Sequence, residues 1–317
     1  MTKLERHIVT SRPITFLRET SKKISPWGFQ GLSLYDVFHF FALQIKKEGL
    51  NVRAAAISFN FLMAIPAATL FLFTLVPYLA ISNDIHTELI KIIVDLTPNT
   101  ATQNAITSFL DDYFSQPKTG LLSFGFLLTL FYASNAIMGI IRTFDRSLLY
   151  KDKTNFILKR MRAFKLVLIL VILLIASTLI SIGQGQLFTW LLTKMHIANS
   201  AGQAWLQFAR WIIIILLFLY SIGFIYRYAP SFKERWKIIS PGSLLATSLM
   251  ILTTILFSFW AKNFSNYNKI YGSIGTVLML VLLVNLNAWI LLVGFELNIS
   301  IMYLKGEVKK TFAKKNV

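Results

Sequence analysis

The chain has 317 residues, of which 55% are hydrophobic and only 15% are charged, and its 32 Lys and Arg outweigh 14 Asp and Glu to give a net charge of +18. Soluble domains carry about 25% charged residues, so this composition excludes an ordinary soluble globular protein. The absence of cysteine excludes disulfides, thiolate metal sites and cysteine nucleophiles.

The first 50 residues precede any long apolar run and divide into two parts. Residues 1–32 are predicted to form a basic cytoplasmic arm. In residues 33–50, apolar side chains recur at helical spacing behind Ser33, which can cap a helix start, and Gly49 ends the pattern. These features predict an amphipathic helix lying in the cytoplasmic membrane interface. A soluble helix packed on cytoplasmic loops is the alternative.

Six runs in the rest of the sequence are long and apolar enough to cross a hydrocarbon core, which takes about 20 residues of helix. The chain is therefore predicted to be an all-α polytopic membrane protein. A single six-helix membrane domain is expected at 33–305, followed by a basic cytoplasmic tail at 306–317. The spans are expected at about 57–81, 121–141, 164–182, 211–229, 241–261 and 274–302.

The first span and the loop after it carry features that bear on the shape of the bundle. The span contains Asn60 and Pro66. Pro66 has no N–H for the backbone ladder, so it is expected to kink the helix. Residues 82–120 form the longest outer loop, and their helical periodicity predicts two short amphipathic helices. We expect these helices to cover the outer mouth of the bundle.

The distribution of basic residues predicts which side of the membrane each connection occupies. When the connections are assigned alternately to two sides, 26 Lys and Arg fall on the side of the termini and 6 on the other. Cytoplasmic loops carry such an excess, so both termini are expected in the cytoplasm. The basic side is expected to bind anionic lipid headgroups. No nucleic-acid partner is expected, because no nucleic-acid-binding signature is present.

No catalytic constellation is visible in the sequence. The four histidines, His7, His39, His86 and His196, are far apart and fall on both predicted sides of the membrane. None has a partner at metal-ligand spacing. No nucleotide-binding or hydrolase motif occurs either. We therefore expect no enzyme activity, no metal and no cofactor, and protein partners are left open.

One acid, Glu296, lies inside an apolar run, past the midpoint of the sixth predicted span toward its cytoplasmic end. A charge at the bilayer centre costs a few kcal/mol or more, and a cation at the same depth lowers that cost. Arg53 at the start of the first span and Arg142 at the end of the second are the candidate cations. Three hypotheses remain open: a structural ion pair, a site that handles a substrate or a proton, and a glutamate that reaches headgroup water.

Amide side chains within the predicted spans form a second group of candidates. Asn60, Asn135, Asn285 and Asn287 are expected to form hydrogen bonds between helices rather than to bind a ligand, unless they gather around one cavity. The candidate substrate or structural cluster inside the bundle comprises Glu296, Arg53, Arg142, Asn60, Asn135 and Asn298.

Three stretches of the chain carry a family resemblance. They are "VRAAAISFNFLMAIPAATLFLF", "ASNAIMGIIRTFDRSL" and "YGSIGTVLMLVLLVNLNAWILLVGFELN", the last of which ends in Gly294-x-Glu296-x-Asn298. In order and spacing they resemble the YihY/BrkB family of bacterial inner-membrane proteins from about residue 35 to residue 302. The resemblance implies six helices with both chain ends in the cytoplasm.

The resemblance implies little about activity. It links the chain loosely to envelope or lipid export and to virulence, with no agreed substrate, and an older ribonuclease label finds no support in these residues. The leading hypothesis is transport or export of a lipid or other amphiphile. A non-transporting membrane scaffold of envelope assembly is the alternative, and a membrane-associated nuclease comes third. A cavity lined by Asn60, Asn135 or Glu296 would favour transport, and a solid bundle would favour the scaffold.

Overall fold

A computed structural model describes most of the chain. The described residues are 19–75 except 27 and 48, then 119–148, 155–182, 200–231, 236–315 except 264, and the positions 87, 90, 104, 107, 108 and 111. Within the helices, the backbone alone is described for 178–182, 200–207, 261–276, 307–315 and a few single positions. Residues 1–18 of the predicted arm and most of the predicted outer-loop helices at 82–120 lie outside the described residues.

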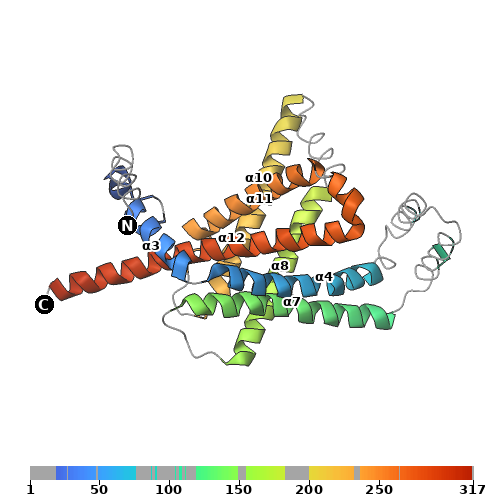
Figure 1. Cartoon of the computed structure of the whole chain (residues 1–317), viewed down its shortest axis with the longest axis horizontal. Helices are drawn as coiled ribbons and strands as arrows, with labels where there is room; N and C mark the ends of the chain where they lie inside the picture. The colour runs from blue at the N-terminus through green and yellow to red at the C-terminus, as the bar shows by residue number, and fades with distance from the viewer. Residues whose placement is uncertain are drawn as a thin grey trace. The chain divides into compact units, whose positions relative to one another are not determined.

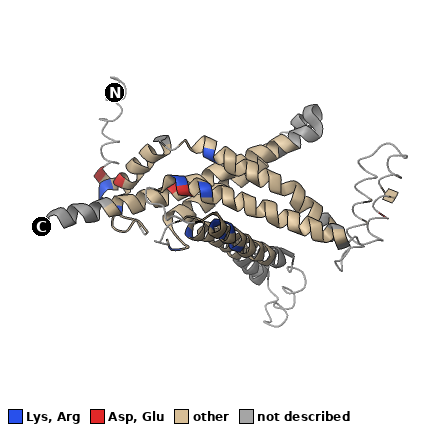
Figure 2. Ribbon diagram, turned by 90° about the horizontal axis from the view of Figure 1, so that it is seen from below, with Lys and Arg blue, Asp and Glu red and all other residues tan. Residues whose placement is uncertain are grey.

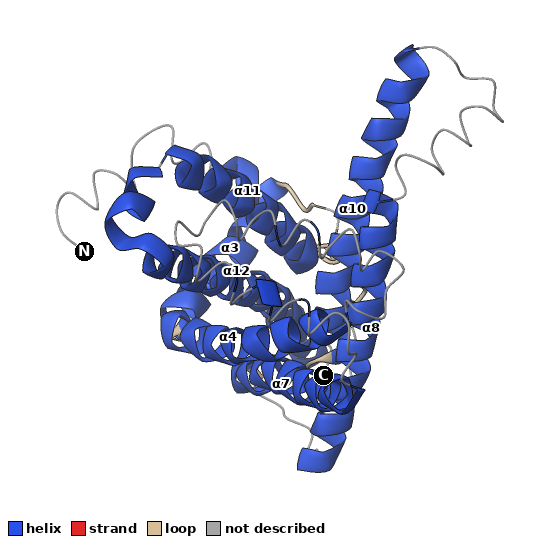
Figure 3. Ribbon diagram, turned by 90° about the vertical axis from the view of Figure 1, so that its right-hand side faces the viewer, coloured by secondary structure: helices blue, strands red, loops and turns tan. Residues whose placement is uncertain are grey.

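The described residues form helices and no strand (Figure 3). A helix satisfies its backbone hydrogen bonds internally, which is what a continuously apolar segment needs in lipid. The predicted all-α class of polytopic membrane protein is confirmed. The main helices are α3 (Leu34–Lys47), α4 (Leu50–Leu75), α7 (Thr119–Ser147), α8 (Phe156–Ile182), α10 (Ser200–Tyr228), α11 (Pro241–Asn263) and α12 (Ser265–Lys315).

Five helices of the described residues are long and apolar enough to cross a membrane, and Figure 2 shows long stretches of ribbon without a charged residue. The predicted third span, 164–182, lies in α8 and is not among the five. The first part of α8 is basic, and its side chains are described only as far as Ser177. Six spans therefore stay a prediction. The five are Leu50–Phe71, Leu122–Ser147, Trp211–Tyr228, Pro241–Trp260 and Val277–Gly306.

The structure divides into two compact units, and each is described by itself. The first unit comprises residues 1–58 and 137–317, and the second comprises residues 59–136. Both α4 and α7 therefore contribute residues to each unit. The boundaries of a single membrane domain at 33–305 stay a prediction.

In the first unit, α11 packs along α12, and α10 packs against both α8 and α11 (Figure 1). Glycines allow the closest of these approaches. A Cβ atom built on Gly242 of α11 would lie only 2.0 Å from the carbonyl oxygen of Gly294 on α12. Small residues of this kind let the backbones of two membrane helices come together.

Aromatic side chains fill the interior beside this crossing. The rings of Phe144 and Phe295 stack with centroids 3.7 Å apart and an interplanar angle of 3°. Tyr226 is completely buried and donates its hydroxyl proton to the Leu291 carbonyl oxygen at 2.7 Å. These contacts hold α7 and α10 against the same part of α12.

Ser33 caps α3, as the sequence predicts. The Asp36 N–H donates to Ser33 Oγ at 3.1 Å, which is the N-cap bond, and the Ser33 hydroxyl donates to Asp36 Oδ2 at 2.6 Å. Val37 and Phe41 are buried, Phe38 is exposed, and α3 packs against α12. The position of α3 in a membrane interface stays a prediction.

The second unit pairs the later part of α4 with the earlier part of α7. A Cβ atom on Gly125 of α7 would lie 2.7 Å from a methyl carbon of Leu70 on α4, and Thr129 donates its hydroxyl proton to the Ala67 carbonyl oxygen at 2.7 Å. Pro66 lies inside α4, which continues beyond it as one helix. The kink at Pro66 stays a prediction.

Candidate functional site

Glu296 of α12 is completely buried in the first unit, and Arg53 of α4 reaches it. Arg53 Nη1 donates to Glu296 Oε1 at 2.9 Å, and the two side chains are 4% and 0% exposed. Of the two cations available in the sequence, the structure places Arg53 beside the acid, whereas Arg142 is exposed on α7. Because α4 begins at Leu50, ahead of the predicted start of the first span at 57, Arg53 lies within the helix rather than before it.

Residues of α7 and α12 complete the surroundings of this pair. Arg53 Nη2 donates to the Thr143 carbonyl oxygen at 2.8 Å and to Ser147 Oγ at 2.5 Å. The Ser147 hydroxyl in turn donates to Glu296 Oε1. The Tyr303 hydroxyl donates to the Ser147 carbonyl oxygen at 3.0 Å. One polar network therefore joins α4, α7 and α12.

The burial of Arg53 and Glu296 determines both the energetic cost of the ion pair and its access to a ligand. Removing two charges from water costs several kcal/mol per ion, and the cost is offset only when good geometry and further hydrogen bonds accompany the ion pair. The guanidinium of Arg53 meets a carboxylate, a carbonyl and a hydroxyl, which is such a set. In this conformation Glu296, at 0% exposure, presents no surface to a ligand. This buried network of an ion pair and hydrogen bonds holds α4, α7 and α12 together.

Asn298, two residues after Glu296, joins α12 to the start of α11. Its Oδ1 accepts the Gly242 N–H at 2.9 Å, and its Nδ2 donates to Ser240 Oγ at 2.9 Å. The first N–H groups of a helix have no partner within the helix, so an amide side chain from outside satisfies one of them here. The sequence placed Asn298 in the candidate cluster but carries no signal for this partner, which lies 56 residues earlier.

A second buried acid, Asp145 of α7, organises the connection after α10. Its Oδ1 accepts the Ser231 N–H at 2.8 Å, and its Oδ2 lies 2.5 Å from Lys159 Nζ of α8. Arg162 Nη1 donates to the Pro230 carbonyl oxygen at 3.4 Å and to Ser231 Oγ at 3.2 Å. Asp145 was not among the predicted site residues. In the sequence, only the position of Asp145 as an acid within a basic segment could have pointed to this role.

The amides of the predicted spans are divided between the two units. Asn60 and Asn135 belong to the second unit, whereas the Arg53–Glu296 pair and Asn298 belong to the first, so a single site that joins them stays a prediction. Asn285 donates to Ser58 Oγ at 3.3 Å and so links α12 to α4. Asn287 donates instead to a carbonyl of its own helix at 2.9 Å. Of these last two amides, Asn285 makes the interhelical contact that the sequence predicted.

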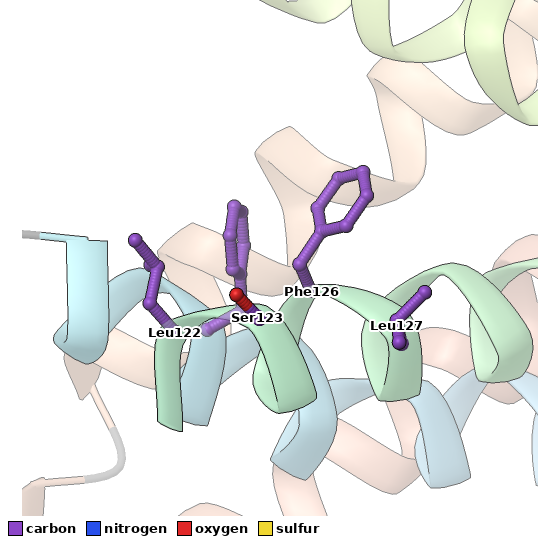
Figure 4. Close-up of a pocket in the computed structure, with 5 residues that line it drawn as sticks. Leu122, Ser123, Phe126 and Leu127 are labelled. Atoms are coloured by element: carbon purple, nitrogen blue, oxygen red, sulfur yellow. The ribbon is translucent and has the colours of Figure 1, made fainter. Parts of the chain in front are cut away.

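The second unit contains an apolar cavity of about 450 Å³. Figure 4 shows Leu122, Ser123, Phe126 and Leu127 of α7 around it, and Phe71 of α4 completes the lining. The Ser123 hydroxyl is the one polar side chain among these lining residues. The cavity can receive hydrocarbon, but it offers no charge to a headgroup.

A cavity of different character, here called the basic cavity, lies between α8 and α10 in the first unit and has a volume of about 330 Å³. Three basic side chains and several apolar side chains line it together. No Asp or Glu belongs to its described lining. Its cations are Arg162, Lys165 and Arg227, and its apolar wall includes Leu166, Ile169 and Phe224.

Comparison with known proteins gives a consistent set of relatives. The sequence profile of the family described as "Virulence factor BrkB" matches residues 41–316. The chain is similar to the ribonuclease-like protein YfkH of Bacillus subtilis, with 26% identity over 78% of this chain and 88% of that protein. It is also similar to a UPF0761 membrane protein of Haemophilus influenzae, with 22% identity over 84% of this chain and 95% of that protein. No solved structure matches.

Proposed function

This chain belongs to the BrkB family of membrane proteins, and from that membership and the chemistry of its cavities we propose that it transports, or helps to export, a lipid or other amphiphile. An amphiphile needs a site that receives a polar headgroup and hydrocarbon together. The basic cavity combines three cations with an apolar wall, and this single observation carries the proposal. Clefts of about 300 Å³ and more are of the size that holds small ligands.

Helix α8, which supplies half of this lining, also supports the proposal. Beyond the basic cavity, α8 exposes the apolar side chains of Leu168, Ile172 and Ile175. Lipid tails are as apolar as leucine, so in a membrane such side chains lie against hydrocarbon. A headgroup in the basic cavity would therefore have a surface on the same helix that suits its tail.

A non-transporting scaffold of envelope assembly is the second candidate, and a specific observation favours it. Neither described cavity is lined by Asn60, Asn135 or Glu296. Glu296 instead lies in a closed network of three helices, which is what a solid bundle provides. This observation favours a scaffold. If the protein transports an amphiphile, we propose that the path does not include Glu296 and that Glu296 holds the surrounding helices together.

A membrane-associated nuclease is the third candidate and is disfavoured. The relative from Bacillus subtilis carries a ribonuclease-like name, and that name describes the relative alone. Metal-dependent nuclease chemistry uses clustered ligands for its ions. Within the part of the chain that the structure describes, no group of three His, Asp or Glu side chains could hold a metal ion. No observation here favours this candidate over the other two.

We place the protein in the bacterial inner membrane as a multi-pass protein with both termini in the cytoplasm. The excess of 26 basic residues over 6 supports this orientation. It also puts the three cations of the basic cavity on the cytoplasmic side. Anionic lipids of that leaflet attract clustered Lys and Arg, so membrane lipids are the proposed partners.

Reconstitution tests the transport proposal. The full chain is placed in vesicles that contain a fluorescent phosphatidylglycerol, with and without an imposed proton gradient. Dithionite then bleaches the label in the outer leaflet only. Transport predicts that protected label becomes accessible faster than in vesicles without protein. If folded protein leaves that rate unchanged under both conditions, transport is rejected and the scaffold is favoured.

A further inference from the structure

The basic cavity gathers positive charge that no described acid offsets. Arg162 donates only to neutral oxygens of the connection after α10 in the described contacts. Asp145, the acid of the same network, is already engaged by Lys159 and by a backbone N–H. Arg227 Nε is buried and finds no hydrogen-bond partner among the described residues. The cavity thus holds donors and charge in excess of the acceptors around it.

A bound anion would offset the positive charge of the basic cavity and would also supply the missing hydrogen-bond acceptors. Like charges that share one cavity repel each other, and the repulsion is stronger near a protein interior than in water. Guanidinium groups present their donors in a planar fork that matches the oxygens of a phosphate, and a lysine adds a compact charge. Arg162, Lys165 and Arg227 supply two such forks and one ammonium.

We propose that the basic cavity binds the phosphate group of an anionic lipid, with Arg162, Lys165 and Arg227 as its ligands. The proposal rests on the proposed function for its ligand class, an amphiphile, and adds the chemistry of the headgroup. Phosphate is also available as a free ion. The apolar wall formed by Leu166 and Phe224 selects the lipid, because a free phosphate gains nothing from an apolar contact.

The neighbouring aromatic residue agrees with this assignment. Arg227 lies 5.5 Å from the centroid of the Tyr228 ring, which keeps the guanidinium near an aromatic face without neutralising it. Arg227 stands in the last turn of α10. The C-terminal end of a helix carries a partial negative charge that holds a cation in place. The cation is therefore fixed at the cavity, while its charge stays available to a ligand.

Titration calorimetry of the full chain in a nonionic detergent tests the site with three probes. The probes are dihexanoyl phosphatidylglycerol, inorganic phosphate, and dihexanoylglycerol, which has the same acyl chains without the phosphate. The variants are Lys165→Gln and Arg227→Gln. Lys165 is exposed and no described contact depends on it, so its replacement leaves the fold intact even if the Arg227 variant unfolds. Lys237→Gln removes an exposed cation outside the cavity and is the matched control.

The expected result is that the lipid phosphate binds most tightly and that Lys165→Gln and Arg227→Gln each weaken it about tenfold, as the loss of a charge-assisted hydrogen bond does. Lys237→Gln should leave the affinity unchanged. Equal losses in all three variants, or equal binding of dihexanoylglycerol, would overturn the site. Equal affinity for inorganic phosphate would overturn the lipid as its ligand and assign the cavity to the free ion.

Binding and transport can fail separately. If phosphatidylglycerol binds through these residues but the vesicles show no movement of label, the site stands and transport does not. If the label moves at the wild-type rate and neither cavity variant weakens the binding of phosphatidylglycerol, transport stands and the phosphate site does not.

Discussion

Gly242 and Gly294 leave no room for a side chain where α11 crosses α12. A Cβ atom on Gly294 would lie 2.5 Å from the Gly242 carbonyl oxygen and 2.4 Å from the Tyr226 hydroxyl oxygen. The first of these neighbours is backbone, which cannot move aside without moving a helix. Gly294 in the interior of α12 is therefore required by the short distance between the two helices.

We predict that Gly294→Ala lowers stability, because the added methyl group must push α11 away or displace Tyr226. Overpacking of this kind costs about 1–3 kcal/mol. Gly306→Ala on the same helix is the matched control, since nothing lies within 4 Å of its Cβ position. Thermal unfolding in detergent should show a clear loss for Gly294→Ala only. Equal melting temperatures for the two variants would contradict the close crossing.

The Arg53–Glu296 pair should behave as one energetic unit. Glu296→Gln removes the carboxylate that faces a buried guanidinium, and breaking a buried pair in this way costs about 3–5 kcal/mol. Arg53→Gln should cost a similar amount. The double variant should be more stable than the sum of the single losses predicts, because neither charge is then left buried alone.

A double-mutant cycle on unfolding measures this coupling between Arg53 and Glu296. Arg142→Gln is the matched control, since Arg142 is the exposed cation that the sequence offered as the other partner. Strictly additive losses for Arg53 and Glu296, or equal coupling of Glu296 to Arg142, would be incompatible with the observed pairing.

Asn298 should stabilise the start of α11 through its two hydrogen bonds. Asn298→Ala leaves the Gly242 N–H without the acceptor that it has in the structure. The loss of a helix cap costs about 1 kcal/mol, and a buried donor left without a partner adds to this. Asn287→Ala on the same helix loses only a bond to its own backbone and should cost less. Faster amide exchange in the first turn of α11 for Asn298→Ala alone is the expected signature.

The absence of cysteine makes the predicted orientation easy to measure. A single cysteine in place of Asp111 or Lys237, both exposed, provides one labelling site on each predicted side. In right-side-out vesicles an impermeant maleimide should label the Asp111→Cys protein alone. In inverted vesicles it should label the Lys237→Cys protein alone. The reverse pattern would place the basic connections outside the cell and remove the proposed cytoplasmic location of the basic cavity.

Hydrocarbon thickness fixes the length and composition of a spanning helix, so the apolar runs predicted most of the long helices. The helix ends were harder to predict. α4 begins at Leu50 rather than near 57, and Arg53 inside it pairs with a buried acid. α12 runs from Ser265 to Lys315, well beyond the expected 274–302, because polar sequence continues the same helix.

The candidate site was predictable only in part, and the reason is helix rotation. The cost of burying Glu296 requires a cation at its depth, and the sequence offers Arg53 and Arg142 for that role. Whether Arg53 or Arg142 faces Glu296 depends on the rotation of α4 and α7 about their axes. The apolar run of a single helix does not determine that rotation. The basic cavity was not predicted either, because Arg162 and Arg227 come together only when α8 packs against α10.

The separation of Arg53 and Glu296 by 243 residues has a consequence for biosynthesis. At roughly 5–20 residues per second, the ribosome takes about 12–50 s to reach the acid after the cation has been made. Throughout that interval the nascent chain holds an arginine whose neutralising carboxylate does not yet exist, so its side chain must extend toward headgroup water. Because α12 carries the acid and is made long after α4, the ion pair that joins these two helices can form only after α12 has been synthesised.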